Sequence, residues 1–112
     1  MSSTIKQLFT GQVAGTVIAL DNNGPTTLRW LTFLNTTAAV AYLQIFNIAA
    51  ASVTLGTTAP TLSIGVPASA ALVLAIPEAG QHMRGSGLSC AGTTTRAGLT
   101  GAALDLNIGW NL

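Results

Sequence analysis

Residues 103–110 of this 112-residue chain read ALDLNIGW, and this stretch carries the plainest structural signal in the sequence. From Leu104 to Trp110 every second residue is a large apolar one, and the residues between them are small or polar. Side chains of a β-strand point alternately to opposite faces of a sheet, so this period of two predicts a strand with one buried face. We therefore expect residues 103–110 to lie against the core of a β-sheet protein.

Two earlier stretches predict strands that are apolar on both faces. In residues 28–36, Trp30 and Leu34 alternate with Leu31 and Phe33. A strand of this kind needs cover on both sides, which we expect from the core on one side and from a neighbouring subunit on the other.

Residues 40–47 repeat this pattern, because the aromatic residues Tyr42 and Phe46 alternate with aliphatic ones. The rival interpretation is a helix over residues 38–51, where alanine is frequent. The β-branched and aromatic residues favour the strand.

The other expected strands are short and separated by turn-forming residues. They are residues 13–20, 52–55, 61–66, 70–76 and, with a weaker pattern, 85–91. About eight short strands at this spacing predict a β-sandwich or barrel in one domain, residues 13–112. Residues 1–12 are expected to form a polar N-terminal arm whose sizeable apolar groups, Ile5, Leu8 and Phe9, dock on a partner.

Charge is scarce in the whole sequence. Charged residues make up 6% of the chain, against about a quarter in an ordinary soluble domain, and residues 30–77 contain no Asp, Glu, Lys, Arg or His. A surface of neutral polar groups is easily desolvated against another protein, so this gap indicates a subunit that packs against others. The basic residues Lys6, Arg29, Arg84 and Arg96 are too few and too scattered for a nucleic-acid interface.

The mean hydropathy of +0.57 raises the question of a membrane span. The best candidate, residues 38–55, contains Gln44, Asn47 and Ser52 and has no close Lys or Arg at its flanks, so no membrane partner is expected. The first residues also show no apolar stretch of signal-peptide length, so secretion by that route is not expected.

The residues that could support catalysis are isolated from one another. His82 and Cys90 could form a nucleophile pair oriented by Glu78 or Asp105, but Cys90 is equally explained as a small core residue. The same four residues lack metal-ligand spacing, and the third acid, Asp21, lies far from the others. We expect no enzyme, no metal site and no cofactor.

The aromatic residues leave a binding function open. Trp30, Tyr42 and Trp110 could form a sugar-stacking platform, although aromatic residues in strands are more often core or interface anchors. The run of residues 92–98 is expected to be an exposed loop in which Arg96 contacts a partner at the rim of an interface.

The central block of the chain resembles a known class of protein. It reads YLQIFN at 42–47, VTLGTTAP at 53–60, SIGVPA at 63–68 and LVLAIP at 72–77, followed by a Gly-rich stretch, a Thr run and NIGW at 107–110. In style and order it resembles the small all-β virion proteins of tailed bacteriophages, among them the cement or decoration proteins of capsids. The resemblance implies a jelly-roll or related sandwich, commonly trimeric, without catalytic residues.

We therefore expect an all-β, jelly-roll-like antiparallel sandwich that forms a homo-oligomer in the virion. The resemblance implies that it is made in the host cytoplasm and binds the major capsid protein or another virion protein. Tail, neck and baseplate proteins, and a glycan-binding β-sandwich module, are the alternatives. The residues expected at interfaces are Ile5, Leu8, Phe9, Trp30, Phe33, Tyr42, Phe46 and Arg96.

Overall fold

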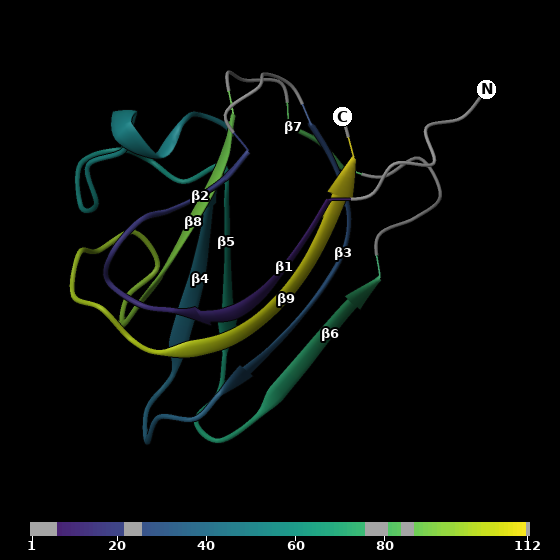
Figure 1. Cartoon of the computed structure of the whole chain (residues 1–112). Coiled ribbons are helices and arrows are strands. Elements are labelled where there is room, and N and C mark those ends of the chain that lie inside the picture. The colour runs from purple at the N-terminus through teal and green to yellow at the C-terminus, as the bar shows by residue number, and fades with distance from the viewer. Residues whose placement is uncertain (1–6, 22–25, 76–80, 84–86, 112) are drawn as a thin grey trace.

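The computed structural model of the protein describes residues 7–21, 26–75, 81–83 and 87–111. These residues form nine strands and one short 3-10 turn, arranged as two facing sheets (Figure 1). In chain order the elements are β1 (Gln7–Val13), β2 (Ile18–Asp21), β3 (Thr26–Asn35), β4 (Ala41–Phe46), η1 (Ala50–Ser52), β5 (Leu62–Val66), β6 (Ala71–Ala75), β7 (Gln81–Met83), β8 (Leu88–Thr93) and β9 (Leu104–Asn111).

The strand order is that of a jelly roll. Sheet A has the order β1-β9-β3-β6, with β7 also paired to β3, and sheet B has the order β2-β8-β4-β5. The antiparallel pairs β4–β5, β3–β6, β2–β8 and β1–β9 are nested, as if one long hairpin had been folded over into two sheets. The all-β, jelly-roll-like sandwich expected from the sequence is confirmed.

The core lies between the inner faces of the two sheets. The alternation in residues 103–110 places Leu104, Leu106 and Ile108 in this core, each at most 1% exposed, as the period of two predicts. On β4 the inner residues are Leu43 and Ile45, both fully buried. Burying each such side chain stabilises the fold by about 1.5–3 kcal/mol relative to leaving it exposed.

A second buried layer lies on the outer side of sheet B. Gln44 and Phe46 alternate with the inward residues of β4, so their side chains point away from the core, yet both are buried. The segments 47–61 and 94–103 cover them, so the chain itself supplies the second cover that the two-sided pattern of β4 requires. The expected strand was correct here, and its outer cover is a loop layer of the same chain.

The segment 13–20 differs from the single strand predicted for it. Val13 ends β1 in sheet A and β2 begins at Ile18 in sheet B, so the chain changes sheet between them. The crossing depends on Gly15, whose backbone packs against that of Gly101: a Cβ built on Gly15 would lie 3.0 Å from the Cα of Gly101. The apolar, β-branched composition of the segment gave no sign of this contact between distant residues.

The N-terminal segment differs as well. Residues 7–12 belong to β1, which pairs along its whole length with β9, so they are a sheet edge and not an arm. Phe9 packs against the core, which fixes the register of this polar strand. Residues 1–6, the remainder of the predicted arm, lie outside the described residues.

Residues 52–55 also do not form the expected strand. The backbone N–H groups of Ser52 and Val53 donate to Ala49 and Ala50 in the turn η1, and those of Thr57 and Thr58 both donate to Thr54. Gly56 then adopts a φ of +85°, which favours glycine. Local turns therefore satisfy donors that a strand would have used for pairing.

Candidate functional site

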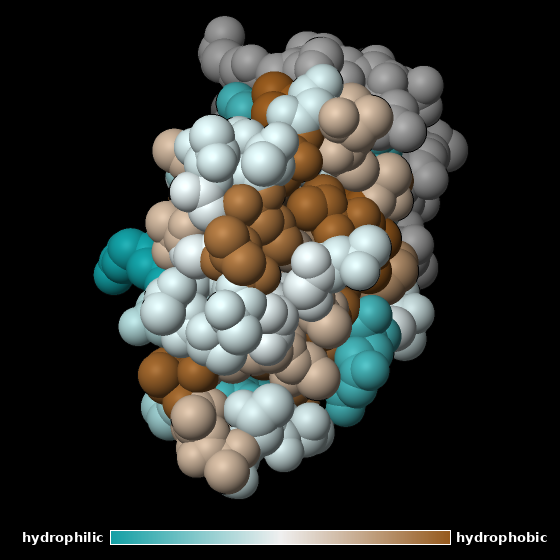
Figure 2. All heavy atoms as spheres, turned by 90° about the vertical axis from the view of Figure 1, so that its left-hand side faces the viewer, coloured by the Kyte–Doolittle hydropathy of each residue, from teal (hydrophilic) through white to brown (hydrophobic). Residues whose placement is uncertain are grey.

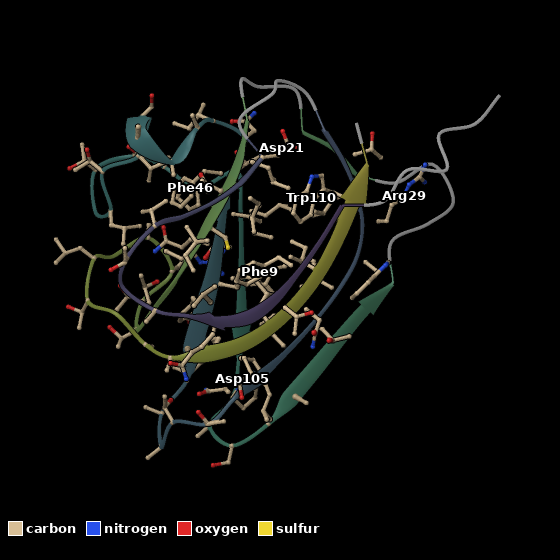
Figure 3. The ribbon with its side chains drawn as sticks, in the orientation of Figure 1. Phe9, Asp21, Arg29, Phe46, Asp105 and Trp110 are labelled. Carbon is tan, nitrogen blue, oxygen red and sulfur yellow. The ribbon has the colours of Figure 1, made fainter. Side chains whose placement is uncertain are left out.

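The structure divides the expected interface residues between core and surface. Phe33 and Phe46 are 2% and 1% exposed, so both are interior residues of this protomer. Phe33 lies in the core, and Phe46 lies under the loop layer near η1 (Figure 3). Phe9 is half-buried against the core, while Ile5 and the side chain of Leu8 lie outside the described part of the structure. Two phenylalanines are thus unavailable to a partner that binds the folded chain.

Tyr42 and Arg96 lie together on the outer side of sheet B. Tyr42 is half-buried and rests on its cross-strand partner Gly65, where an added Cβ would lie 2.8 Å from the Cε2 atom of the ring. Arg96 is exposed on the loop between β8 and β9, and its carbonyl oxygen accepts a 2.6 Å hydrogen bond from Oγ of Ser63. The loop therefore lies across the outer surface of β5, beside Tyr42.

Hydrogen bonds from the sheet hold this loop in place. The Nε2 atom of Gln44 donates to Oγ1 of Thr93 at 2.7 Å and to the carbonyl oxygen of Gly98 at 3.0 Å. Within the loop, the N–H of Thr94 donates to the carbonyl oxygen of Thr100 at 2.9 Å. Because Gln44 is fully buried, water does not compete for these bonds, and the loop is fixed before it meets any partner.

The fixed loop presents Leu99, which is 65% exposed. Its side chain lies against the backbone of Gly56, so the two segments that cover sheet B meet here. Figure 2 shows this side of the molecule, with apolar residues gathered in the middle of the face and weakly polar ones around them. We call this surface, centred on Leu99, Arg96 and Tyr42, the loop face. Sequence reasoning ended the exposed loop at Gly98 and missed Leu99, although an isolated leucine between Gly98 and Thr100 was the available signal.

The outer face of sheet A carries two further exposed apolar residues, while Val40 is exposed between β3 and β4. Trp30 is 38% exposed and Leu34 is 40% exposed, both on the outer side of β3. The indole of Trp30 lies over its cross-strand partner Gly109, where an added Cβ would lie 2.7 Å from Nε1 and 2.8 Å from Cε2. Here the two-sided pattern of β3 is not explained by a covering segment among the described residues.

Trp110, the third aromatic residue of the sugar platform considered as an alternative, faces the core. It is 3% exposed, and its Nε1 donates a 3.0 Å hydrogen bond to Oδ2 of the buried Asp21 (Figure 3). Trp30 therefore lies on the outside of sheet A, Tyr42 lies on the outside of sheet B, and Trp110 lies in the core. They do not form one platform.

The residues considered for catalysis do not come together among the described residues. Cys90 is fully buried in the core, and desolvation raises the pKa of its thiol to about 12, so it stays protonated and unreactive at neutral pH. Asp105 lies exposed on the outer side of sheet A, while Glu78 and the side chain of His82 lie outside the described residues. In the part of the chain that the structure describes, no three of His, Cys, Asp and Glu gather as metal ligands, and no helix is long and apolar enough to cross a membrane.

The comparisons with known proteins do not assign a family. No family model matches the sequence, and no curated protein matches it. A solved structure described as "Bacillus endospore appendages form a novel family of disulfide-linked pili" is similar over 100% of this chain and 95% of that chain, with 10% sequence identity and a TM-score of 0.33.

Proposed function

We propose that the protein is a capsid cement or decoration protein of a tailed bacteriophage, which binds the outer surface of the capsid and stabilises contacts between major capsid protein subunits. Two features support this function: the resemblance of about residues 26–110 to such virion proteins, and a jelly-roll sandwich with very few charges. Of the four charged residues among those described, Asp21 is buried, which leaves Arg29, Arg96 and Asp105 for the surface of the described residues.

The loop face of sheet B is the observation that carries this proposal. Leu99 is the most exposed large apolar side chain of the described residues, and hydrogen bonds from Gln44 and Ser63 fix the loop that bears it. A rigid apolar projection loses little conformational entropy on binding, and its contacts are hardly weakened by salt. Both properties suit a protein that must stay attached to a particle.

In this proposal the protein acts as a homo-oligomer, and a trimer is the state that the resemblance implies. Its partners are further copies of itself and the major capsid protein, and it is located at the capsid surface of the virion. Several copies held together on a symmetric lattice would gain avidity, so no single contact has to be strong.

The test is the binding of purified protein to capsids of the phage that encodes it, prepared without the protein. We expect the wild-type chain to saturate the capsids and to raise their resistance to heat. Leu99→Ser should lower the affinity for capsids at least about tenfold, because it removes an apolar contact worth about 1.5–3 kcal/mol per site when buried.

Leu34→Ser is the matched control, since Leu34 is an exposed leucine on the opposite sheet. It should bind capsids as the wild type does, and circular dichroism should show both variants folded. Absence of wild-type binding, or equal losses in the two variants, would contradict the proposal. Antibody labelling of the tail, neck or baseplate in electron micrographs would instead assign the protein to that part of the virion.

A further inference from the structure

Trp30 is held as a rigid flat surface on the outside of sheet A. Its ring lies over Gly109, as the distances of 2.7–3.1 Å from an added Cβ to Nε1, Cε2 and Cζ2 show. The absence of a side chain on Gly109 thus lets the indole lie against the strand, with one ring face covered and 38% of the residue exposed. An aromatic ring fixed in this way can stack on a flat ligand without losing rotamer freedom.

Neutral hydrogen-bonding groups lie beside the ring in register. The next outward row across β1, β9 and β3 is Thr10–Asn107–Thr32, and the row after it is Gln12–Asp105–Leu34, in which the leucine is the one apolar member. Rows on one face of a sheet are about 7 Å apart, so these groups extend about 14 Å from the indole along the strands. The amide of Asn107 makes one long hydrogen bond, 3.4 Å from Nδ2 to Oγ1 of Thr32, and its Oδ1 has no hydrogen bond to any other described residue.

From this arrangement we propose that the outer face of sheet A binds a neutral glycan chain. One sugar ring stacks on Trp30, and the hydroxyl groups of the next ring bond to Asn107, Thr10 and Gln12. The proposed capsid function is independent of this site, because the loop face lies on the other sheet.

The chemistry of the face favours a sugar chain over a charged polymer or a buried protein anchor. A pyranose ring has a flat C–H surface for the indole and hydroxyl groups at its rim, which can both donate to and accept from amides and hydroxyls. Among the described residues this face carries two charged side chains of opposite sign, Asp105 in the rows and Arg29 beside Trp30 at the β3 bulge (Figure 3), so it has no net charge that would attract a charged polymer. A protein hot spot would instead surround its aromatic anchor with apolar cover. The row of the ring itself is Leu8–Gly109–Trp30, but the next row, Thr10–Asn107–Thr32, is polar on all three strands.

The test is an NMR titration of the full-length protein with two neutral hexasaccharides, cellohexaose and maltohexaose. The chain has two tryptophans, so it gives two indole N–H signals, and the buried Trp110 is an internal reference. We expect at least one hexasaccharide to shift the Trp30 signal in a saturable manner and to leave the Trp110 signal in place.

Trp30→Ala should weaken the affinity at least about tenfold, within the range for loss of a stacked ring. Tyr42→Ala is the matched control, because Tyr42 is also an outward aromatic residue that rests on a glycine, Gly65, but on the other sheet. The affinity should be unchanged in this variant. The Trp110 signal reports in each variant that the core is intact.

Three results would overturn the inference. They are the absence of a Trp30 shift with both hexasaccharides, an equal loss of affinity in Trp30→Ala and Tyr42→Ala, and tighter binding of an anionic hexagalacturonate than of either neutral probe.

Discussion

The substitution Asn35→Asp tests how the two sheets are joined at one end of the sandwich. Asn35 ends β3 and is fully buried. Its Nδ2 donates to the carbonyl oxygens of Ala39 at 2.7 Å and of Val66 and Pro67 at 3.1 Å each. Its Oδ1 accepts from Thr37, at 2.9 Å from the backbone nitrogen and 2.6 Å from Oγ1. Because β3 belongs to sheet A and Val66 ends β5 in sheet B, this one amide ties both sheets to the turn between them.

Aspartate at position 35 keeps the shape of the side chain and the acceptor for Thr37. It replaces the donating NH₂ group with an oxygen that faces three carbonyl oxygens. The two hydrogens of Nδ2 account for about 2 kcal/mol of hydrogen bonding, and an unpaired buried carboxylate adds a further penalty. We therefore expect Asn35→Asp to lower the free energy of unfolding by about 3–5 kcal/mol at pH 7.

The same substitution should make stability depend on pH. Burial opposite carbonyl oxygens raises the pKa of the new carboxyl group above its unfolded value of about 4. Protonation removes the charge and restores one donor, so the loss should be smallest below about pH 4 and should grow as the pH rises through the folded pKa. The wild-type baseline is nearly flat, since the chain has three acidic residues and one histidine.

The measurement is urea unfolding at pH 4 and pH 7, at one protein concentration so that any oligomer contributes equally. Asn35→Ala is the control: it loses the donor of Nδ2 and also the acceptor for Thr37, but it adds no titratable group, so its deficit should be similar at both pH values. If Asn35→Asp unfolds within about 1 kcal/mol of the wild type at pH 7, or gains stability as the pH rises, the reasoning is refuted.

Two further predictions concern the core. Burial raises the pKa of Cys90 from 9.0 to about 12, so the wild type should lose about 1.4 kcal/mol of stability per pH unit from about pH 9 to pH 12, relative to Cys90→Ala. Parallel stability curves for the two proteins above pH 9 would contradict this. Asp21→Ala should lower stability by about 1–3 kcal/mol, because it leaves the buried indole N–H of Trp110 without this acceptor. A double-mutant cycle with Trp110→Phe should then show a coupling of at least about 0.5 kcal/mol, and additive effects would contradict the inferred hydrogen bond.

The sequence predicts well those strands whose pattern of apolar residues follows from the alternation of side chains in a sheet, without contacts between distant residues. The alternation from Leu104 to Trp110 identified β9, and the two-sided apolar runs identified β3 and β4. All three are inner strands of their sheets. The sheet change between Val13 and Ile18 could not be predicted, because it depends on the packing of Gly15 against a glycine far along the chain. For the same reason β1 was expected to be an arm: its pairing with β9 is tertiary, and only Leu8, Phe9 and Val13 of its seven residues are sizeable apolar ones.

The charge gap of residues 30–77 has two physical causes that the sequence could not separate. On β4, Gln44 is buried beneath the loop layer and its amide bonds Thr93 and Gly98, while its Oε1 has no hydrogen-bond partner among the described residues. A carboxylate at this position would lose both bonds and bury a charge, so neutrality here serves the fold of the chain itself. On β3, the outward residues Trp30 and Leu34 remain exposed, and neutrality there has no internal explanation. Within the gap, only the second cause argues for a ligand, and it supports the glycan site proposed on sheet A. The capsid contact proposed at the loop face depends instead on Leu99, which lies outside the gap.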